Sequence, residues 1–195
     1  MNITLRTDII NFLIKKNNYN KYLEIGVQDQ ARNFNNINCK TKIGVDPNGS
    51  TTFKLTSDTF FEQNEETFDI VLIDGLHLED QVDKDIQNSL KFLNKNGTVV
   101  LHDCLPISES HQREVYGGGG IWAGTVWRSI AKLRMTDSSL EINVVDIDWG
   151  CGILRKKSKN TLFKKSIIDY SFYEKNKNEL MNVITVEQFK QWYGK

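Results

Sequence analysis

The sequence predicts a single α/β domain, built on a doubly wound, Rossmann-like sheet of seven mostly parallel strands with an antiparallel hairpin towards its C-terminal end. Two unbroken apolar runs, residues 70–73 and 98–101, suit strands that are buried on both faces. Between them, apolar residues recur at the spacing of one helix face: Val82, Ile86, Leu90 and Leu93. Asn96 and Gly97 then provide a helix stop. Strand, helix and strand form a βαβ unit with a right-handed crossover.

The first part of the chain predicts a helix and three further strands. Residues 3–16 carry apolar side chains at helical spacing and end in two lysines, which predicts an amphipathic helix covering one edge of the sheet. Residues 21–27 and 42–46 are short apolar segments that end at a glycine or at a Pro-Asn-Gly turn, as strands do. A weaker strand is expected at residues 52–55.

The later part of the chain predicts a loop, a helix and the hairpin. Four consecutive glycines, residues 117–120, lie in a polar segment that we expect to be either a lid over the site or a surface loop. Residues 122–134 have the periodicity of a helix, and residues 140–148 and 152–155 predict the two antiparallel strands. Residues 158–195 are expected to form a C-terminal helical extension.

The turn after the first strand separates two classes of cofactor. Asp46 ends the second strand, where an acid in a doubly wound fold binds ribose hydroxyls; the alternative role is to cap the turn that follows. A pyrophosphate needs several glycines so that backbone amides approach it, but residues 26–31 contain a single glycine. Glu24 and Asp29 would repel a pyrophosphate and attract the amino and sulfonium groups of S-adenosylmethionine. The turn therefore favours that cofactor over NAD.

Five motifs resemble class I S-adenosylmethionine-dependent methyltransferases. The resemblance is strongest to a small bacterial branch associated with surface-glycan and secondary-metabolite pathways, and it spans about residues 20–157. The motifs are LEIGV at 23–27, IGVDPN at 43–48, LTSD at 55–58, FDIVLIDGLH at 68–77 and VVLHDCLP at 99–106.

The resemblance also implies which residues bind the cofactor. Glu24 and Gly26 would line its methionine end, and Asp46 would hold the ribose. The residues implied to lie near the adenine and the transferred methyl group are Ser57, Asp58 and Asp74. Many members of the family carry a second glycine where this chain has residues 28–30, so the pose of the cofactor at this turn is an open point.

Carboxyl and imidazole groups follow both strands of the βαβ unit. Asp74 and His77 come after the first run, and His102 and Asp103 after the second. The carboxyl ends of parallel strands meet at one edge of the sheet, where ligands bind, so we expect a catalytic site there that includes Asp74, His77 and Asp103. His77 is expected to take the proton of an alcohol acceptor, as related sugar O-methyltransferases use a histidine at this position. The alternative is that His77 caps the following helix.

Asp74, His102 and Asp103 are also candidate metal ligands. Metal-dependent relatives hold magnesium with acids at these two strand ends, and several have an acid where this chain has His102. An imidazole at that position weakens a magnesium site or favours manganese. Mg²⁺ or Mn²⁺ is thus a second candidate cofactor. In a metal-free site, Asp74 and Asp103 would orient His77 or bind an acceptor hydroxyl.

The predicted function is an S-adenosylmethionine-dependent methyltransferase that acts on a hydroxyl group of a small molecule. The resemblance alone suggests a sugar or a nucleotide-linked sugar. Trp122, beside the glycines, is expected to contact this acceptor, whereas Trp127 is expected to lie in the core and Cys104 to be a packing residue. A cofactor-binding protein without turnover, acting as a partner subunit, remains an alternative. An NAD-dependent oxidoreductase is disfavoured by the missing glycines.

Length and composition fit one cytoplasmic domain. The 195 residues suffice for one core, with an N-terminal helix at 1–19, a cofactor-binding core at 20–157 and the extension at 158–195. The formal net charge is zero, so neither nucleic acid nor a membrane is expected as a partner, and a homo-oligomer is left open. Three cysteines without metal-binding spacing, and an N-terminus unlike a signal peptide, indicate a reducing compartment.

Overall fold

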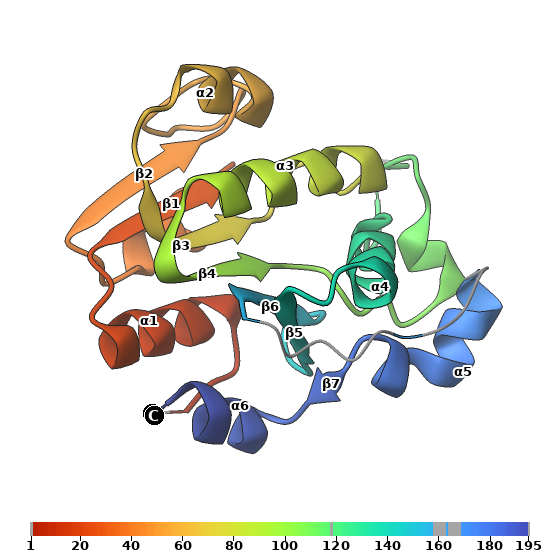
Figure 1. Ribbon diagram of the computed structural model, residues 1–195. Coiled ribbons are helices and arrows are strands. Elements are labelled where there is room, and N and C mark those ends of the chain that lie inside the picture. The colour runs from red at the N-terminus through yellow and green to blue at the C-terminus, as the bar shows by residue number, and fades with distance from the viewer. Residues whose placement is uncertain (1, 118, 158–162, 164–168, 195) are drawn as a thin grey trace.

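A seven-stranded sheet with helices on both faces forms the centre of the computed structural model, which describes residues 2–117, 119–157, 163 and 169–194 (Figure 1). The strands lie in the order β2-β1-β3-β4-β6-β5-β7. Their bounds are β1 Lys21–Ile25, β2 Thr41–Val45, β3 Phe68–Ile73, β4 Leu93–Leu101, β5 Leu140–Val145, β6 Cys151–Lys156 and β7 Val183–Ile184.

The sheet is parallel at one side and mixed at the other. β1 pairs in parallel with β2 and β3, and β3 pairs in parallel with β4. β6 runs antiparallel between β4 and β5, and β7 is parallel to β5. The predicted fold, a mostly parallel seven-stranded sheet with an antiparallel hairpin, is therefore confirmed. β3 lies between two strands and two helical layers, which is why Ile70, Val71, Leu72 and Ile73 are all buried.

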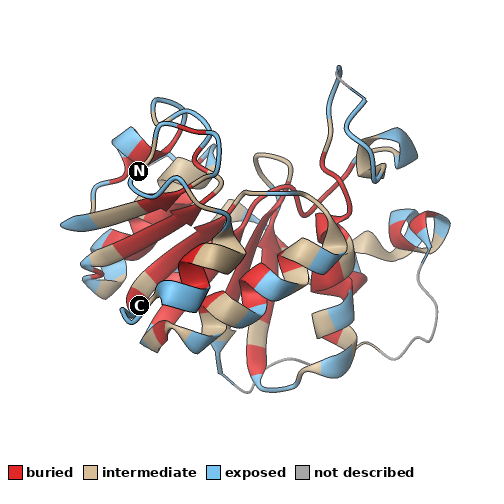
Figure 2. Cartoon of the chain, turned by 90° about the horizontal axis from the view of Figure 1, so that it is seen from above, coloured by how far each residue is buried: buried red, intermediate tan, exposed pale blue. Residues whose placement is uncertain are grey.

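Two layers of helices cover the sheet. The helices are α1 Arg6–Asn17, α2 Ser57–Gln63, α3 Glu79–Lys91, α4 Val126–Thr136, α5 Tyr170–Leu180 and α6 Val186–Tyr193, with short 3-10 turns at Phe34–Asn36 and Glu109–Gln112. Alternate side chains of a strand point to opposite faces, so Val71 belongs to the apolar cluster that contains residues of α2, α3, α4 and α5, and Leu72 belongs to the cluster that contains residues of α1 and α6. Buried residues are concentrated in the strands and on the inward helix faces (Figure 2). No helix among the described residues is long and apolar enough to cross a membrane.

The N-terminal helix lies on a face of the sheet, and the expectation that it covers one edge was wrong. Ile9, Ile10 and Leu13 are fully buried among side chains of β1, β3, β4, β5 and β6. An apolar stripe predicts that a helix docks, but the position of docking depends on which face of the sheet the other helices leave uncovered. In this position the first residue of α1, Arg6, reaches the carboxyl edge of the parallel strands.

The strand expected at residues 52–55 does not form. The segment contributes an isolated bridge, in which Phe53 pairs in parallel with Val45 at the outer edge of β2. Thr52, Phe53 and Lys54 are exposed, so no burial stabilises a longer pairing. The seventh strand is β7, which lies in the C-terminal segment and was not predicted.

The boundary between α3 and β4 also differs from the prediction. α3 ends at Lys91, and Leu93, which was expected on the helix face, already pairs with Phe68. The next pair along β3 is Ile70 with Thr98, so the intervening residues of β4 bulge out of the ladder. Asn96 has a positive φ of 89° and lies within this bulge, not at the end of the helix.

Candidate active site

A cavity of about 770 Å³ lies at the carboxyl edge of the parallel strands. The turns after β1, β2, β3 and β4 surround it, together with the segment before α4, which contributes Tyr116 and Trp122. The structure brings to this one cavity all the residues predicted as catalytic, as metal ligands, or as cofactor-binding by the family resemblance: Glu24, Gly26, Asp46, Ser57, Asp58, Asp74, His77, His102 and Asp103.

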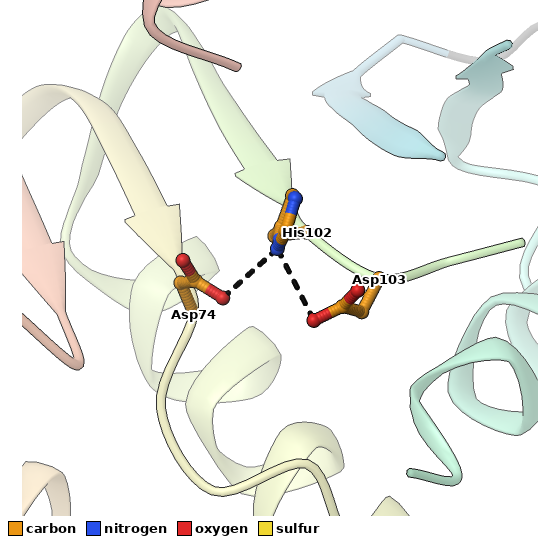
Figure 3. A group of neighbouring side chains, drawn as sticks. All are labelled: Asp74, His102 and Asp103. Atoms are coloured by element: carbon orange, nitrogen blue, oxygen red, sulfur yellow. Dashed lines mark hydrogen bonds and ion pairs between the residues drawn. The ribbon is translucent and has the colours of Figure 1, made fainter. Parts of the chain in front are cut away.

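The centre of the site is a cluster formed by Asp74, His102 and Asp103 (Figure 3). The ends of β3 and β4 are in register, with Ile73 opposite Leu101, so the residues that follow the two strands are brought together. Nδ1 of His102 lies 3.1 Å from Oδ1 of Asp74 and 3.2 Å from Oδ2 of Asp103. Asp103 adopts a left-handed backbone conformation, with φ 59°, which is uncommon for a residue other than glycine and turns the chain sharply after β4.

His102 is a buried cation held by carboxyl groups. Burial disfavours the charged imidazole. The charge of Asp74 favours it, and so do the hydrogen bonds to Asp103 and Asp148. Together they raise the pKa of His102 to about 12, so the ring is protonated at neutral pH. Burial by itself would raise the pKa of Asp74, yet the charge and hydrogen bond of His102 hold it well below its ordinary value.

His77 lies against the same two carboxyl groups and does not cap α3. Its Nε2 is 3.5 Å from Oδ1 of Asp74, and its Nδ1 is 3.4 Å from Oδ2 of Asp103. Burial lowers the pKa of His77, but the hydrogen bond and charge of Asp74 and the charge of Asp103 leave it above its ordinary value. The imidazole stacks on the indole of Trp122, with ring centroids 5.0 Å apart and an interplanar angle of 17°. The first amide of α3 is instead bound by Oγ1 of Thr125.

Glu24 is almost fully buried beneath the cavity, where two side chains hold one of its oxygens. The hydroxyl of Tyr22 and the amide of Asn33 both donate to Oε2. Among the described residues, no hydrogen-bond donor reaches Oε1. Burial raises the pKa of Glu24 to about 7, although the two hydrogen bonds act in the opposite direction. Glu24 thus has a free acceptor and an ionisation close to neutral pH.

The turn after β1, where many family members carry a second glycine, is held by the carboxylate of Asp46. Gly26, with φ 89°, has no room for a side chain, because a Cβ atom would lie 2.1 Å from the carbonyl oxygen of Asp74. Gln28 takes the left-handed conformation, with φ 48°, and its amide donates to Oδ2 of Asp46 at 2.9 Å. Oδ1 of Asp46 accepts from the amides of Asn48 and Gly49, so the turn-capping role is present.

Asp29 does not act at the site. Its side chain is exposed, is not part of the cavity wall and accepts a hydrogen bond from the amide of Ala31. The expectation that it attracts a cationic cofactor was therefore wrong. Glu24 lies within β1 and Asp29 in the turn that follows, and the sequence has no pattern that tells whether an acid of this turn points inwards.

The far end of the cavity contains a polar cluster around Gln81. Its Nε2 lies within 3.2 Å of oxygen atoms of Ser57, Asp58 and Asp85. Asp85 is buried on α3, and burial raises its pKa to about 6. Sequence reasoning predicted Ser57 and Asp58 at this end but missed Gln81 and Asp85. Their positions on the predicted helix between the two central strands were the available indication.

Arg6 and Asp148 are the main site residues that sequence reasoning missed. Oδ2 of Asp148 accepts from the backbone amide of Arg6 at 2.9 Å and from its Nη1 at 3.1 Å, and lies 3.4 Å from Nε2 of His102. Burial opposes ionisation of Asp148, but the hydrogen bonds from His102 and Arg6 lower its pKa to about 2. Arg6 precedes every recognisable motif, and no sequence spacing relates it to residues more than 60 positions away.

The expected core positions of Trp127 and Cys104 are confirmed, and the contact of Trp122 with an acceptor stays a prediction. Trp122 lines the cavity, and Trp127 and Cys104 are buried in the core. Burial also raises the pKa of the Cys104 thiol, which disfavours the reactive thiolate and agrees with a packing role.

Comparison with known proteins connects this site to methyltransferases. Residues 10–104 match a family described as a methyltransferase domain, and a search of curated proteins finds no match. Similar solved structures include a methyltransferase of Podospora anserina, PaMTH1, bound to S-adenosylhomocysteine, with 15% identity, 80% of each chain covered and a TM-score of 0.56. The O-methyltransferase TomG of Streptomyces achromogenes, involved in tomaymycin synthesis and solved with S-adenosylmethionine, has 11% identity and a TM-score of 0.56, covering 78% of this chain and 79% of its own.

A third similar structure is larger. The methyltransferase MycE from the mycinamycin biosynthetic pathway, in complex with Mg, S-adenosylhomocysteine and mycinamycin VI, has 14% identity and a TM-score of 0.50 over 80% of this chain and 50% of its own. At these low sequence identities the solved structures establish only the fold of the chain. The domain match indicates the type of activity, methyl transfer. On the two together, the chain has the fold of class I S-adenosylmethionine-dependent methyltransferases, and its residues 10–104 match a methyltransferase domain.

Proposed function

We propose that the enzyme methylates a hydroxyl group of a small molecule, a sugar or a nucleotide-linked sugar, as in the bacterial branch associated with surface glycans and secondary metabolites. The observation that carries the proposal is the position of His77, which lies against Asp74 and Asp103 in the wall of the same cavity as Glu24. The names of TomG and MycE, an O-methyltransferase and a methyltransferase solved with mycinamycin VI, agree with a small-molecule acceptor.

The cofactor would lie across the turns after β1, β2 and β3. Bound S-adenosylmethionine supplies an electrophilic methyl group. We assign its ammonium group to the free Oε1 of Glu24 and its ribose hydroxyls to Asp46. Each oxygen of Asp46 keeps acceptor capacity, because a carboxylate oxygen has two lone pairs. The adenine is assigned to the end of the cavity with Ser57 and Asp58, and the transferred methyl group to Asp74.

His77 is assigned as the general base. In its neutral form the imidazole accepts the proton of the acceptor hydroxyl while the oxygen attacks the methyl carbon in line. Asp74 and Asp103 contact the ring and stabilise the imidazolium that forms. The stack on Trp122 restricts the rotation of the ring. The half-exposed Tyr116 and Trp122 would border the acceptor, since both line the cavity and lie against each other.

A divalent cation is compatible with the donor set of the site. Asp74, His102 and Asp103 each offer one ligand atom, and these atoms lie within 4.8 Å of one another. Two carboxylates and an imidazole suit manganese or another transition metal better than magnesium. Metal binding requires that His102 release the proton that the neighbouring carboxylates stabilise on its ring. The metal would then polarise the acceptor oxygen and lower the pKa of its proton.

The experiment is a methyl-transfer assay with S-adenosylmethionine and a panel of sugars and nucleotide-linked sugars, read as formation of S-adenosylhomocysteine. The wild type is compared with His77→Gln, each with Mn²⁺, with Mg²⁺ and with chelator. We expect at least one hydroxyl acceptor, and a rate for His77→Gln that is lower by about 10²–10⁴, because general-base catalysis contributes that much.

His111 provides the matched control. It is a histidine of the segment before α4 that does not line the cavity, so His111→Gln should retain the wild-type rate. A fall to the His77→Gln rate in this control would contradict the assignment. Binding of S-adenosylhomocysteine without turnover on any acceptor would favour the alternative of a cofactor-binding partner subunit.

A further inference from the structure

Arg6 lines the cavity, and its guanidinium group is only partly hydrogen-bonded within the described part of the chain. Nη1 is engaged by Asp148 at 3.1 Å. Nε lies 3.2 Å from Oδ2 of Asp74, but it is buried and forms no hydrogen bond there. Within the described part of the chain, Nη2 has no polar partner. The edge formed by Nε and Nη2 therefore lacks the paired oxygen atoms that this side of a guanidinium binds best.

The methionine half of the cofactor carries a negative charge that a cation in the cavity wall would stabilise. It carries an ammonium group and a carboxylate, and the groups so far assigned to this half, Glu24 and Asp74, attract the first and repel the second. Arg6 is close enough to Glu24 that its charge lowers the pKa of that carboxyl group, against the larger effect of burial. A carboxylate placed next to an ammonium held by Glu24 is therefore within the field of Arg6.

The other cations of the cavity wall are less suited to this carboxylate. Arg32 is exposed, and its Nη1 donates to the side chain of Gln28 outside β1. His102 is enclosed by the carboxyl groups of Asp74, Asp103 and Asp148. Arg6 lines the cavity, has an Nη2 with no polar partner among the described residues, and is near enough to Glu24 for its charge to lower the pKa of that group.

We propose that Arg6 binds the carboxylate of the methionine moiety of S-adenosylmethionine through Nε and Nη2. This inference rests on the proposed function of the cavity. Binding of the carboxylate would leave the start of α1 in place, because Asp148 holds both the backbone amide and Nη1 of Arg6. Only the contact between Nε and Asp74 is replaced, which frees Asp74 to face the sulfonium.

A hydrogen-bond chain couples Arg6 to the ammonium site. Thr7, the next residue of α1, donates through its hydroxyl to Oδ1 of Asn33 at 2.6 Å. Asn33 in turn donates to Oε2 of Glu24 at 2.9 Å. The start of α1 thus fixes the separation of Arg6 and Glu24, the two groups that would hold the two charges of one amino acid.

The test compares two ligands that differ by a single carboxylate. S-Adenosylhomocysteine and its decarboxylated analogue, in which an aminopropyl group replaces the amino-acid portion, are titrated calorimetrically into wild type, Arg6→Met and Arg6→Lys. Wild type should bind S-adenosylhomocysteine about 10- to 100-fold more tightly than the analogue, as expected for charge-assisted hydrogen bonds. In Arg6→Met this preference should disappear, through weaker binding of S-adenosylhomocysteine alone. Arg6→Lys should retain part of it.

Arg128 is the matched control. It is a partly buried arginine whose Nη1 pairs with Glu114 at 3.2 Å, away from the cavity. Arg128→Met should keep the wild-type preference for the carboxylate. Equal weakening of both ligands in Arg6→Met, or an unchanged preference, overturns the assignment while leaving the cofactor site intact. Wild type that binds neither ligand overturns the proposed function, and the role of Arg6 with it.

Discussion

Glu24 is a carboxyl group whose ionisation falls in the range in which the enzyme would work. Its pKa of about 7 results from burial, which two hydrogen bonds to one oxygen offset only in part. Because the pKa is raised by folding, the folded state binds more protons than the unfolded state between about pH 4.5 and 7, and stability falls as pH rises through this window. An ammonium group bound at Oε1 would lower the pKa of Glu24, because its positive charge favours the ionised carboxylate.

Binding of S-adenosylhomocysteine should therefore strengthen as pH rises towards 7 and then level off. Below that pH Glu24 must release a proton on binding, which weakens affinity by up to about tenfold per pH unit. Calorimetric titrations between about pH 5.5 and 8 measure this slope. In Glu24→Gln the slope should flatten, and Asp85→Asn isolates the part of any remaining slope that comes from Asp85, whose pKa burial raises to about 6. A full slope in Glu24→Gln would contradict the assignment of the ammonium group.

At the scale of elements, the site depends on contacts between segments that are distant in the chain. α3 begins after Leu78, which offers no side-chain cap, and Oγ1 of Thr125 accepts from the amide of Glu79 at 2.7 Å. The amide of Thr125 also donates to the carbonyl oxygen of His77 at 2.8 Å. The segment before α4 thus fixes the start of α3 and the backbone of His77 together.

Thr125→Val should lower the free energy of unfolding by about 1–2 kcal/mol, because it removes the acceptor of a buried helix-terminal amide while keeping the shape of the side chain. Urea denaturation measures the change. The control is Thr136→Val, where the hydroxyl donates to a carbonyl oxygen of its own helix at an exposed position, and a change within about 0.5 kcal/mol is expected. Equal losses in the two variants would indicate that Thr125 does not cap α3.

At the scale of the whole molecule, the predictable features are those that depend on local pattern. Unbroken apolar runs predicted β3 and β4. Because the two strands are parallel and their carboxyl ends meet, Asp74, His77 and Asp103 line one cavity. Arg6 was not predictable, because its partner Asp148 is 142 positions away and the contact depends on where α1 docks. The strand predicted at residues 52–55 was wrong for a related reason. Whether a short segment pairs depends on burial, and Phe53 is exposed at that edge of the sheet.

All the roles proposed for the residues of the site depend on an adenosyl cofactor binding in the cavity at the carboxyl edge. A calorimetric titration of the wild-type protein with S-adenosylhomocysteine, and in parallel with NADH, tests it most directly. We expect one S-adenosylhomocysteine per chain with micromolar affinity and no heat of binding with NADH, because the turn after β1 has a single glycine and buried Glu24 beneath it. Binding of NADH in preference to S-adenosylhomocysteine would contradict it.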